Sequence, residues 1–201
     1  MKRLLVIATV VVACRSPTSR YYTLVATPGD LAPPQNELQI DVLPVDVPPE
    51  VDRAEIVVRD SPGEVTPVDT RSWIAPLALE IRRALSDDLT RDLGARDIAG
   101  VTPADNVPTY RIKLAVHRFE SELGKRAVIE AVSTVRDASG AGPPLVCSLG
   151  ASEQARDGYD GLAEAHQRAL ATIATAVAAS VRSLRAGSPV CPERPTAVRT
   201  R

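Results

Sequence analysis

Few side chains in this 201-residue sequence are suited to serve as nucleophiles, acid–base groups or metal ligands. It contains three cysteines (Cys14, Cys147 and Cys191) and two histidines (His117 and His166). Their spacing matches neither a zinc site nor a catalytic triad, so we expect no metal and no catalytic residues. A GxSxG nucleophile motif is absent, as is the GxxxxGK[ST] loop that binds ATP phosphates. The sequence therefore disfavours an enzyme and leaves the three thiols as the groups with chemistry to explain.

The first thiol, Cys14, follows an N-terminal apolar segment. Lys2 and Arg3 precede the apolar run from Leu4 to Ala13, and Cys14 comes directly after it. A membrane-spanning helix needs about 20 apolar residues, so this run is too short to span a bilayer. A positive start followed by a short apolar segment and a small residue is typical of a secretory signal. We interpret residues 1–13 as a signal peptide, so the rest of the chain is exported.

The order Val11, Val12, Ala13, Cys14 resembles a bacterial lipobox. The resemblance implies that the thiol of Cys14 receives diacylglycerol and that the new amino terminus is acylated, with palmitate for example. Several acyl chains on one residue make a stable membrane anchor, since each buried CH2 contributes about 0.8 kcal/mol. Residues 14–20 then form a lipidated tether that reaches at most about 20 Å. The alternative is an ordinary cleaved signal with an incidental cysteine.

The two remaining thiols lie in a chain that the signal sends to an oxidising compartment. Paired cysteines tend to be bridged there, and we expect a disulfide between Cys147 and Cys191. The alternative is one buried thiol and one exposed thiol in the C-terminal tail, residues 186–201. That tail is rich in proline and arginine, so we expect it to be irregular.

Composition limits the class of the mature protein. Removing residues 1–13 leaves 188 residues, which suits one domain, and we place it at 21–185. The loss of Lys2 and Arg3 brings the net charge from −1 to −3, and aromatic residues make up only 3% of the chain. Nucleic-acid binding needs a basic patch and often aromatic stacking platforms, so we expect no nucleic-acid partner.

Hydrophobic periodicity predicts the elements of this domain. Apolar residues recur every fourth position from Leu77 to Leu89, which indicates an amphipathic helix that starts near Pro76 and ends at Gly94. A second helix follows Asp160, its expected N-cap, and extends to Leu184. Strand patterns with a period of two occur at 37–45, 110–119 and 126–137, and we expect further strands at 21–24, 56–59 and 145–155. We predict an α+β single domain in which two long helices pack on one face of a mostly antiparallel sheet.

Three blocks of the sequence resemble a known family. Asp52, Arg53 and Arg59 fit an Asp-Arg-x-x-Ile-Val-x-Arg pattern, and a second block contains Trp73, Pro76 and Leu77. Tyr159 begins the third block, at the start of the last helix. Together with the lipobox, these blocks are similar to those of the ABC-type transport auxiliary lipoproteins. Ile74 and Ala75 depart from the Ala and Glu usual in that family, so no role is carried over for that acid.

The resemblance implies a function and a location. Such lipoproteins act beside mammalian-cell-entry (MCE) domain proteins, which form lipid tunnels powered by an inner-membrane ABC permease and ATPase. The implied role is to dock a tunnel to the outer membrane for the transfer of phospholipid or other hydrophobic cargo, without a cofactor. Arg15 after Cys14 implies sorting to the outer membrane, on its periplasmic face. A homo-oligomer would suit a tunnel mouth, although nothing in the spacing requires one.

Other interpretations stay open at this stage. The alternative function is that of a freestanding envelope lipoprotein, such as an assembly factor, a cell-wall binder or a weak hydrolase. Trp73 fits a core residue better than a ligand platform, and Asp52 with Arg53 fits a surface ion pair. Arg59 fits either a partner contact or a loop cap. His166 lies on the apolar stripe of the last helix, whereas His117 lies on the polar face of its strand.

Overall fold

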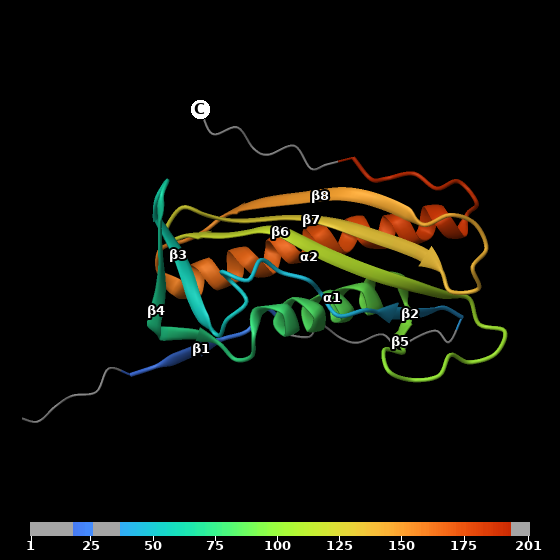
Figure 1. Ribbon diagram of the computed structural model, residues 1–201, viewed down its shortest axis with the longest axis horizontal. Helices are drawn as coiled ribbons and strands as arrows, with labels where there is room; N and C mark the ends of the chain where they lie inside the picture. The colour runs from blue at the N-terminus through green and yellow to red at the C-terminus, as the bar shows by residue number, and fades with distance from the viewer. Residues whose placement is uncertain (1–17, 26–36, 194–201) are drawn as a thin grey trace, which may run out of the picture.

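A computed structural model describes residues 18–25 and 37–193 of the chain. The predicted signal peptide and Cys14 therefore lie outside the described residues, as does the end of the tail. The described part is a single α+β domain with two helices, as the sequence predicts, and it contains eight strands (Figure 1). The elements are β1 (Arg20–Tyr22), β2 (Gln39–Val42), β3 (Glu55–Ser61), β4 (Glu64–Trp73), α1 (Leu77–Leu93), β5 (Arg96–Asp97), β6 (Thr109–Glu122), β7 (Arg126–Asp137), β8 (Leu145–Gln154) and α2 (Gly158–Arg185).

The strands form two sheets. The larger one has the order β5-β2-β6-β7-β8, and the smaller one has the order β1-β4-β3. The long pairings, β6 with β7, β7 with β8 and β3 with β4, are antiparallel, as predicted. The short pairings of β2 with β5 and β6, and of β1 with β4, are parallel, which the sequence did not predict. Parallel neighbours require long connections, and the chain from β3 to β5, which includes α1, provides one between β2 and β6.

Helix α1 has the ends that the sequence predicts. Pro76 occupies the N-cap position, where its missing N–H costs no hydrogen bond. Gly94 ends the helix in the left-handed conformation, with φ 60°, which glycine adopts without a steric penalty. The side of α1 that faces the core carries Leu77, Glu80, Ile81, Ala84, Leu85, Asp88 and Leu89. Two acids on this buried stripe need polar partners in the interior.

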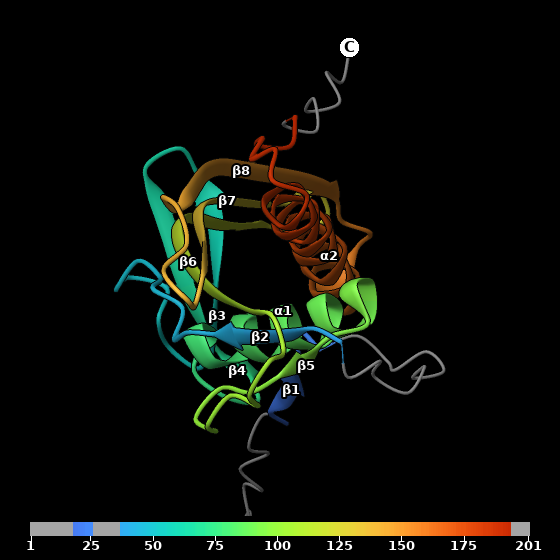
Figure 2. The same cartoon turned by 90° about the vertical axis from the view of Figure 1, so that its right-hand side faces the viewer.

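Helix α2 packs against β7, β8 and α1, and Figure 2 shows it beside the large sheet. Its many buried alanines allow this close approach; they are Ala163, Ala165, Ala169, Ala174 and Ala178. The helix begins at Gly158, whose φ of 82° turns the chain, so Asp157 is its N-cap and makes no side-chain cap hydrogen bond. Asp160 lies in the first turn, and our expectation that it would be the N-cap was wrong.

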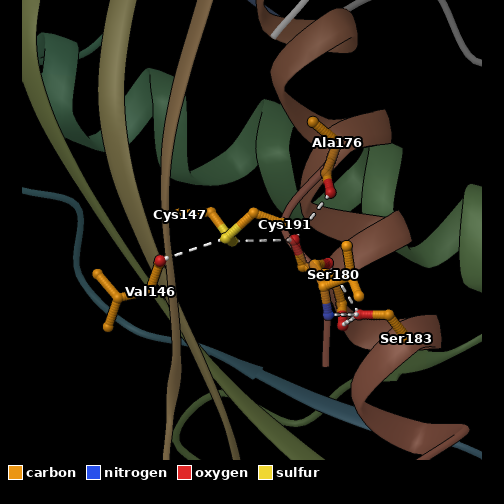
Figure 3. The surroundings of a disulfide bond; sticks show 7 residues. Val146, Cys147, Ala176, Ser180, Ser183 and Cys191 are labelled. Carbon is orange, nitrogen blue, oxygen red and sulfur yellow. Dashed lines mark hydrogen bonds between the residues drawn. A yellow bond between two sulfur atoms is a disulfide. The ribbon is translucent and has the colours of Figure 1, made fainter. Parts of the chain in front are cut away.

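The structure contains the Cys147–Cys191 disulfide, which joins β8 to the tail after α2 (Figure 3). Cys147 is buried, and the hydroxyl of Ser180 lies 3.8 Å from its sulfur. Two further contacts hold the tail: the hydroxyl of Ser183 donates to the carbonyl of Val190 and accepts from its N–H. The described tail residues, 186–193, have no helix or strand, as expected. The bridge therefore fixes an irregular segment to the folded domain.

Neither α1 nor α2, the helices of the described part of the chain, has the length and apolar character required to cross a membrane.

Candidate functional site

The residues of the three sequence blocks lie just before and within β3, in β4, and at the starts of α1 and α2. Figure 1 shows that these segments meet at the same end of the molecule as β1. The described residues contain no group of three or more His, Cys, Asp or Glu side chains arranged to hold a metal ion. We call this end of the domain, formed by β1, β3, β4 and the starts of α1 and α2, the motif end.

An aromatic cluster forms the buried centre of the motif end. Trp73 is 2% exposed, and its ring meets those of Phe119 and His166 edge to face, at centroid distances of 6.3 and 6.0 Å. The rings of Phe119 and His166 stack at 4.1 Å. Offset or edge-on pairs of this kind add to the stability gained by burial. Trp73 is therefore a core residue, which agrees with the simpler of the two interpretations of its role.

A β-bulge in β6 turns the side chains of Phe119 and Ser121 toward this cluster. Along β6, Ile112, Leu114 and Val116 face the core, but the pairing with β7 shifts at His117. Past the shift the buried residues are Phe119 and Ser121, while His117 is exposed, as expected. A bulge of one residue reverses which face a strand buries. Without it, Phe119 and Ser121 would point away from His166.

His166 and Ser121 form a hydrogen-bonded pair, but its surroundings do not suit catalysis. The hydroxyl of Ser121 lies 2.8 Å from Nε2 of His166, and both residues are buried. Nδ1 of His166 is buried without a hydrogen-bond partner among the described residues, so no carboxylate orients the ring. Burial lowers the pKa of His166 to about 3, which keeps the imidazole neutral. The pair satisfies a hydroxyl in the core, where Ser121 is 2% exposed and His166 is 0% exposed.

Asp52 acts on a helix rather than on its neighbour Arg53. Its Oδ1 accepts a hydrogen bond of 3.3 Å from the N–H of Ala78, in the first turn of α1. The first N–H groups of a helix lack partners within the helix, and a carboxylate there is favoured by the helix dipole. Arg53 instead pairs with Glu55 at 3.0 Å on the surface. The surface pair of Asp52 with Arg53, one of the interpretations considered, is therefore replaced by these two separate contacts.

Arg59 lies at the junction of β3 with β6. Its guanidinium donates to the carboxylate of Glu120 at 2.9 Å and to the carbonyl of Pro62 at 3.2 Å. It therefore caps the β3–β4 turn, which was one of the two roles considered for it. Glu120 also accepts from Arg118 at 2.6 Å, and this contact, with Arg59, lowers the pKa of Glu120.

An open cleft of about 490 Å³ borders this junction. Its charged lining residues are Arg59, Asp60, Arg118, Glu120, Glu122, Lys125 and Arg126. Arg126 pairs with Glu122 at 2.6 Å, and Glu120 is shared by two arginines. Because these charges largely neutralise one another, the cleft has no strong preference for an anion or a cation.

Tyr159 lies at the start of α2 and contacts β4. The guanidinium carbon of Arg71 is 5.3 Å from the centre of its ring, within the range of a cation–π interaction. Nearby, burial raises the pKa of Tyr22, and a hydrogen bond with Asp160 raises it further. These contacts join the first strand of the domain to its last helix.

Sequence reasoning missed a buried carboxylate that holds the first strand. Glu80 of α1 is 0% exposed and accepts hydrogen bonds from the hydroxyl of Thr23 at 2.8 Å and the N–H of Leu24 at 2.9 Å. From α2, the side-chain amide of Gln167 donates to the carbonyl of Thr23 at 3.0 Å. The available signal was an acid on the apolar stripe of a helix, next to Ile81. Both helices therefore bind the segment that follows the predicted tether.

Comparisons with known proteins identify the family. A family model described as the ABC-type transport auxiliary lipoprotein component matches residues 22–178. The chain belongs to this family. The ABC-type transport auxiliary lipoproteins are, by that description, lipid-anchored components of transport systems, so the chain is a membrane-anchored envelope protein associated with ABC transport. A search of curated protein sequences found no significant match.

Solved structures support the fold of this auxiliary lipoprotein. The crystal structure of an uncharacterized protein matches with a TM-score of 0.65 and 19% identity, covering 82% of this chain and 99% of that one. A protein from Xanthomonas campestris matches with a TM-score of 0.63 and 17% identity, covering 86% of this chain and 100% of that one. At these identities the likeness concerns the fold. It shows that the whole described domain is a unit that recurs elsewhere.

Proposed function

We propose that this protein is the outer-membrane component of an MCE-type lipid transport system. In this role it docks the distal end of a periplasmic MCE tunnel to the outer membrane, so that phospholipid or other hydrophobic cargo avoids water. The observation that carries the proposal is the family match, which spans nearly the whole described domain. The sequence blocks at the motif end and the predicted acylation site are consistent with it.

The location follows from the N-terminal sequence. Acyl groups on Cys14 would hold the domain at a membrane, and Arg15 at the next position favours the outer membrane. Arg20, the first residue of β1, is the sixth residue after Cys14, and six residues extend to about 20 Å at most. The domain would therefore lie close to the periplasmic surface of that membrane, where a tunnel from the inner membrane ends.

The mechanism is one of attachment rather than of chemistry. The histidine–serine pair of the described domain is enclosed in the core, and His166 stays neutral. The sequence lacks the GxxxxGK[ST] loop that binds nucleotide phosphates, so the energy for transport would come from the ATPase of the system. The contribution of this chain would be a rigid domain with a short anchor on one side and a docking surface for the MCE protein on the other.

A co-purification experiment tests the docking step. The acylated lipoprotein is mixed with the MCE protein encoded beside it, and retention on the immobilised MCE protein is measured. We expect retention of the wild type and also of the Cys14→Ser variant, because that change removes the anchor and leaves the domain intact. The variant should be lost from membrane fractions while still binding its partner. Absence of retention with both proteins folded would contradict docking and favour a freestanding envelope lipoprotein, as would the absence of MCE, permease and ATPase genes nearby.

A further inference from the structure

The strand that follows the tether is fixed firmly to the domain. All three residues of β1 pair with β4, and the two residues after β1 bind the carboxylate of Glu80. Gln167 adds a hydrogen bond from α2. Since two helices and a sheet hold this segment, the point where the tether leaves the domain does not move relative to the rest of the surface. The anchor therefore determines which side of the domain lies nearest the membrane.

That side carries exposed apolar side chains. Tyr21 is 68% exposed, Ile74 is 67% exposed and Leu79 is 39% exposed. Tyr22 and Trp73 are paired in register and face the core, so Tyr21 and Ile74, the residues next to them, face outward on the same side. The N–H of Ile74 donates to the carbonyl of Tyr22 at 2.8 Å, which keeps the two segments adjacent. We call Tyr21, Ile74, Pro76 and Leu79 the apolar rim.

Basic side chains flank the apolar rim. Arg20 is exposed and directly precedes Tyr21. Arg83 lies four residues after Leu79 on the same face of α1, and its side chain is 52% exposed. Asp87 follows one turn further from the rim. The carboxylate of Glu80, which is buried and bound to Thr23 and Leu24, lies 3.9 Å from the guanidinium of Arg83 and partly offsets its charge, while about half of the Arg83 side chain stays exposed.

We propose that the apolar rim lies in the headgroup region of the membrane that holds the anchor. Tyrosine and aliphatic side chains are suited to that boundary, and arginine side chains reach from it to anionic lipid phosphates. The tether keeps the rim within about 20 Å of the bilayer, where the effective concentration is high enough for a small surface to bind. This proposal rests on acylation of Cys14, as in the proposed function, but does not require an MCE partner.

The proposed contact gives the domain a defined orientation. Figure 1 shows β1 and the start of α1 at one end of the molecule and the loop after β5 at the other. With the rim at the membrane, that loop, which carries the exposed residue Val101, lies at the other end of the long axis from the contact.

Spin labels at two matched positions test the orientation. Ile74 is 67% exposed and directly follows β4, whereas Val101 is 68% exposed and lies in the loop after β5. These two segments lie at opposite ends of the long axis in Figure 1. Since Cys147 and Cys191 are bridged and Cys14 carries lipid, Ile74→Cys or Val101→Cys introduces a single free thiol. Each acylated variant is labelled with a nitroxide and placed in phosphatidylethanolamine–phosphatidylglycerol vesicles without any partner protein. Accessibility to a water-soluble nickel complex and to oxygen is then measured.

We expect a several-fold lower nickel accessibility and a higher oxygen accessibility at position 74 than at 101. Adding Tyr21→Ser and Leu79→Ser to Ile74→Cys should raise nickel accessibility to the value at 101; because both residues are exposed, the fold should persist by circular dichroism. Equal accessibility at 74 and 101 in the acylated protein would overturn the rim contact, whatever the co-purification result. Mass spectrometry of the same sample separates this outcome from a failure of acylation, which would contradict the anchor itself.

Discussion

The two ends of the described chain are attached to the domain by different means. The N-terminal segment, β1 with Thr23 and Leu24, is held by hydrogen bonds to β4 and to the buried carboxylate of Glu80. The C-terminal tail is held by the covalent bond between Cys191 and Cys147. The first attachment is intrinsic to folding in any compartment. The second needs an oxidising environment, and the predicted signal peptide would direct the chain to such a compartment.

The two segments differ in how many elements of the domain hold them. The N-terminal segment continues from the proposed anchor and is bound by three elements, so its position is set together with the core. The tail has no strand or helix with which to pair and depends on a single cross-link, helped by Ser183. Substitutions at Cys191 and Glu80 compare the two attachments, and substitutions at His166 and Asp52 test the core and the start of α1.

The largest expected effect comes from removing the cross-link. Cys191→Ser opens a loop of 44 residues, and the chain-entropy model gives a loss of about 4 kcal/mol in the free energy of unfolding. Urea denaturation of the oxidised protein measures this loss. Val190→Ser is the control, since Val190 is exposed and lies beside the bridge. A loss no larger than that of the control would mean that the tail adds nothing to stability.

Removal of the buried carboxylate should rank second. Glu80→Ala leaves the hydroxyl of Thr23 and the N–H of Leu24 without their acceptor, which should cost about 3 kcal/mol. Amide hydrogen exchange at Leu24 should also become faster than in the wild type. Glu80→Gln keeps one acceptor oxygen, so its free energy of unfolding and its exchange rate at Leu24 should lie between those of the wild type and the alanine variant. Unchanged exchange at Leu24 in the alanine variant would show that β4 alone holds this segment.

The third prediction concerns pH. The pKa of His166 is about 3 in the folded protein, below its ordinary value of about 6.5 in the unfolded chain. The unfolded state therefore binds more protons between these values. The stabilisation from the neutral imidazole is complete above pH 6.5 and is lost as the pH falls towards 3, by about 1.4 kcal/mol per pH unit.

Comparison of two histidine variants checks this slope. His166→Phe cannot titrate, so its free energy of unfolding should depend less on pH between 6.5 and 4.5 than that of the wild type. The exposed residue His117 provides the control, and His117→Gln should keep the wild-type slope. If all three proteins lose stability equally over this range, protonation of other groups controls the acid response.

The smallest expected effect comes from Asp52. Asp52→Ala removes the acceptor for the N–H of Ala78 at the start of α1 and should cost about 1 kcal/mol. Arg53→Ala is the matched control, because its ion pair with Glu55 is exposed and should contribute less than about 0.5 kcal/mol. Thermal unfolding of the two variants compares these effects. Equal unfolding midpoints for the two variants would show that Asp52 does not stabilise the start of α1.

The sequence predicted the parts of the fold that depend on local pattern. The apolar stripe of α1 and its ends at Pro76 and Gly94 follow from helix periodicity and backbone preferences. The β6-β7-β8 meander follows from alternation and short turns, and the cysteine pairing follows from the count and the compartment. Each of these signals is contained in neighbouring residues or in a simple count.

The remaining features depend on contacts between distant parts of the chain. The two-residue strand β5 has too few residues to show a period, and its parallel pairing with β2 is set by the path of the chain. The bulge at His117 leaves no signature in the alternation before it, yet it determines which residues reach His166. The acceptor role of Glu80 requires knowing that Thr23 and Leu24, which are 57 and 56 residues from it in the sequence, lie beside α1.

The parallel pairing of β1 with β4 also has a mechanical consequence. Tension on the acyl chains would enter the domain at Arg20, and the three β1–β4 pairings come before the bonds to Glu80 along the chain. A lateral pull by moving lipids would thus load the edge of the small sheet before it reaches the helices. The domain would yield at its margin, while its interior stayed folded.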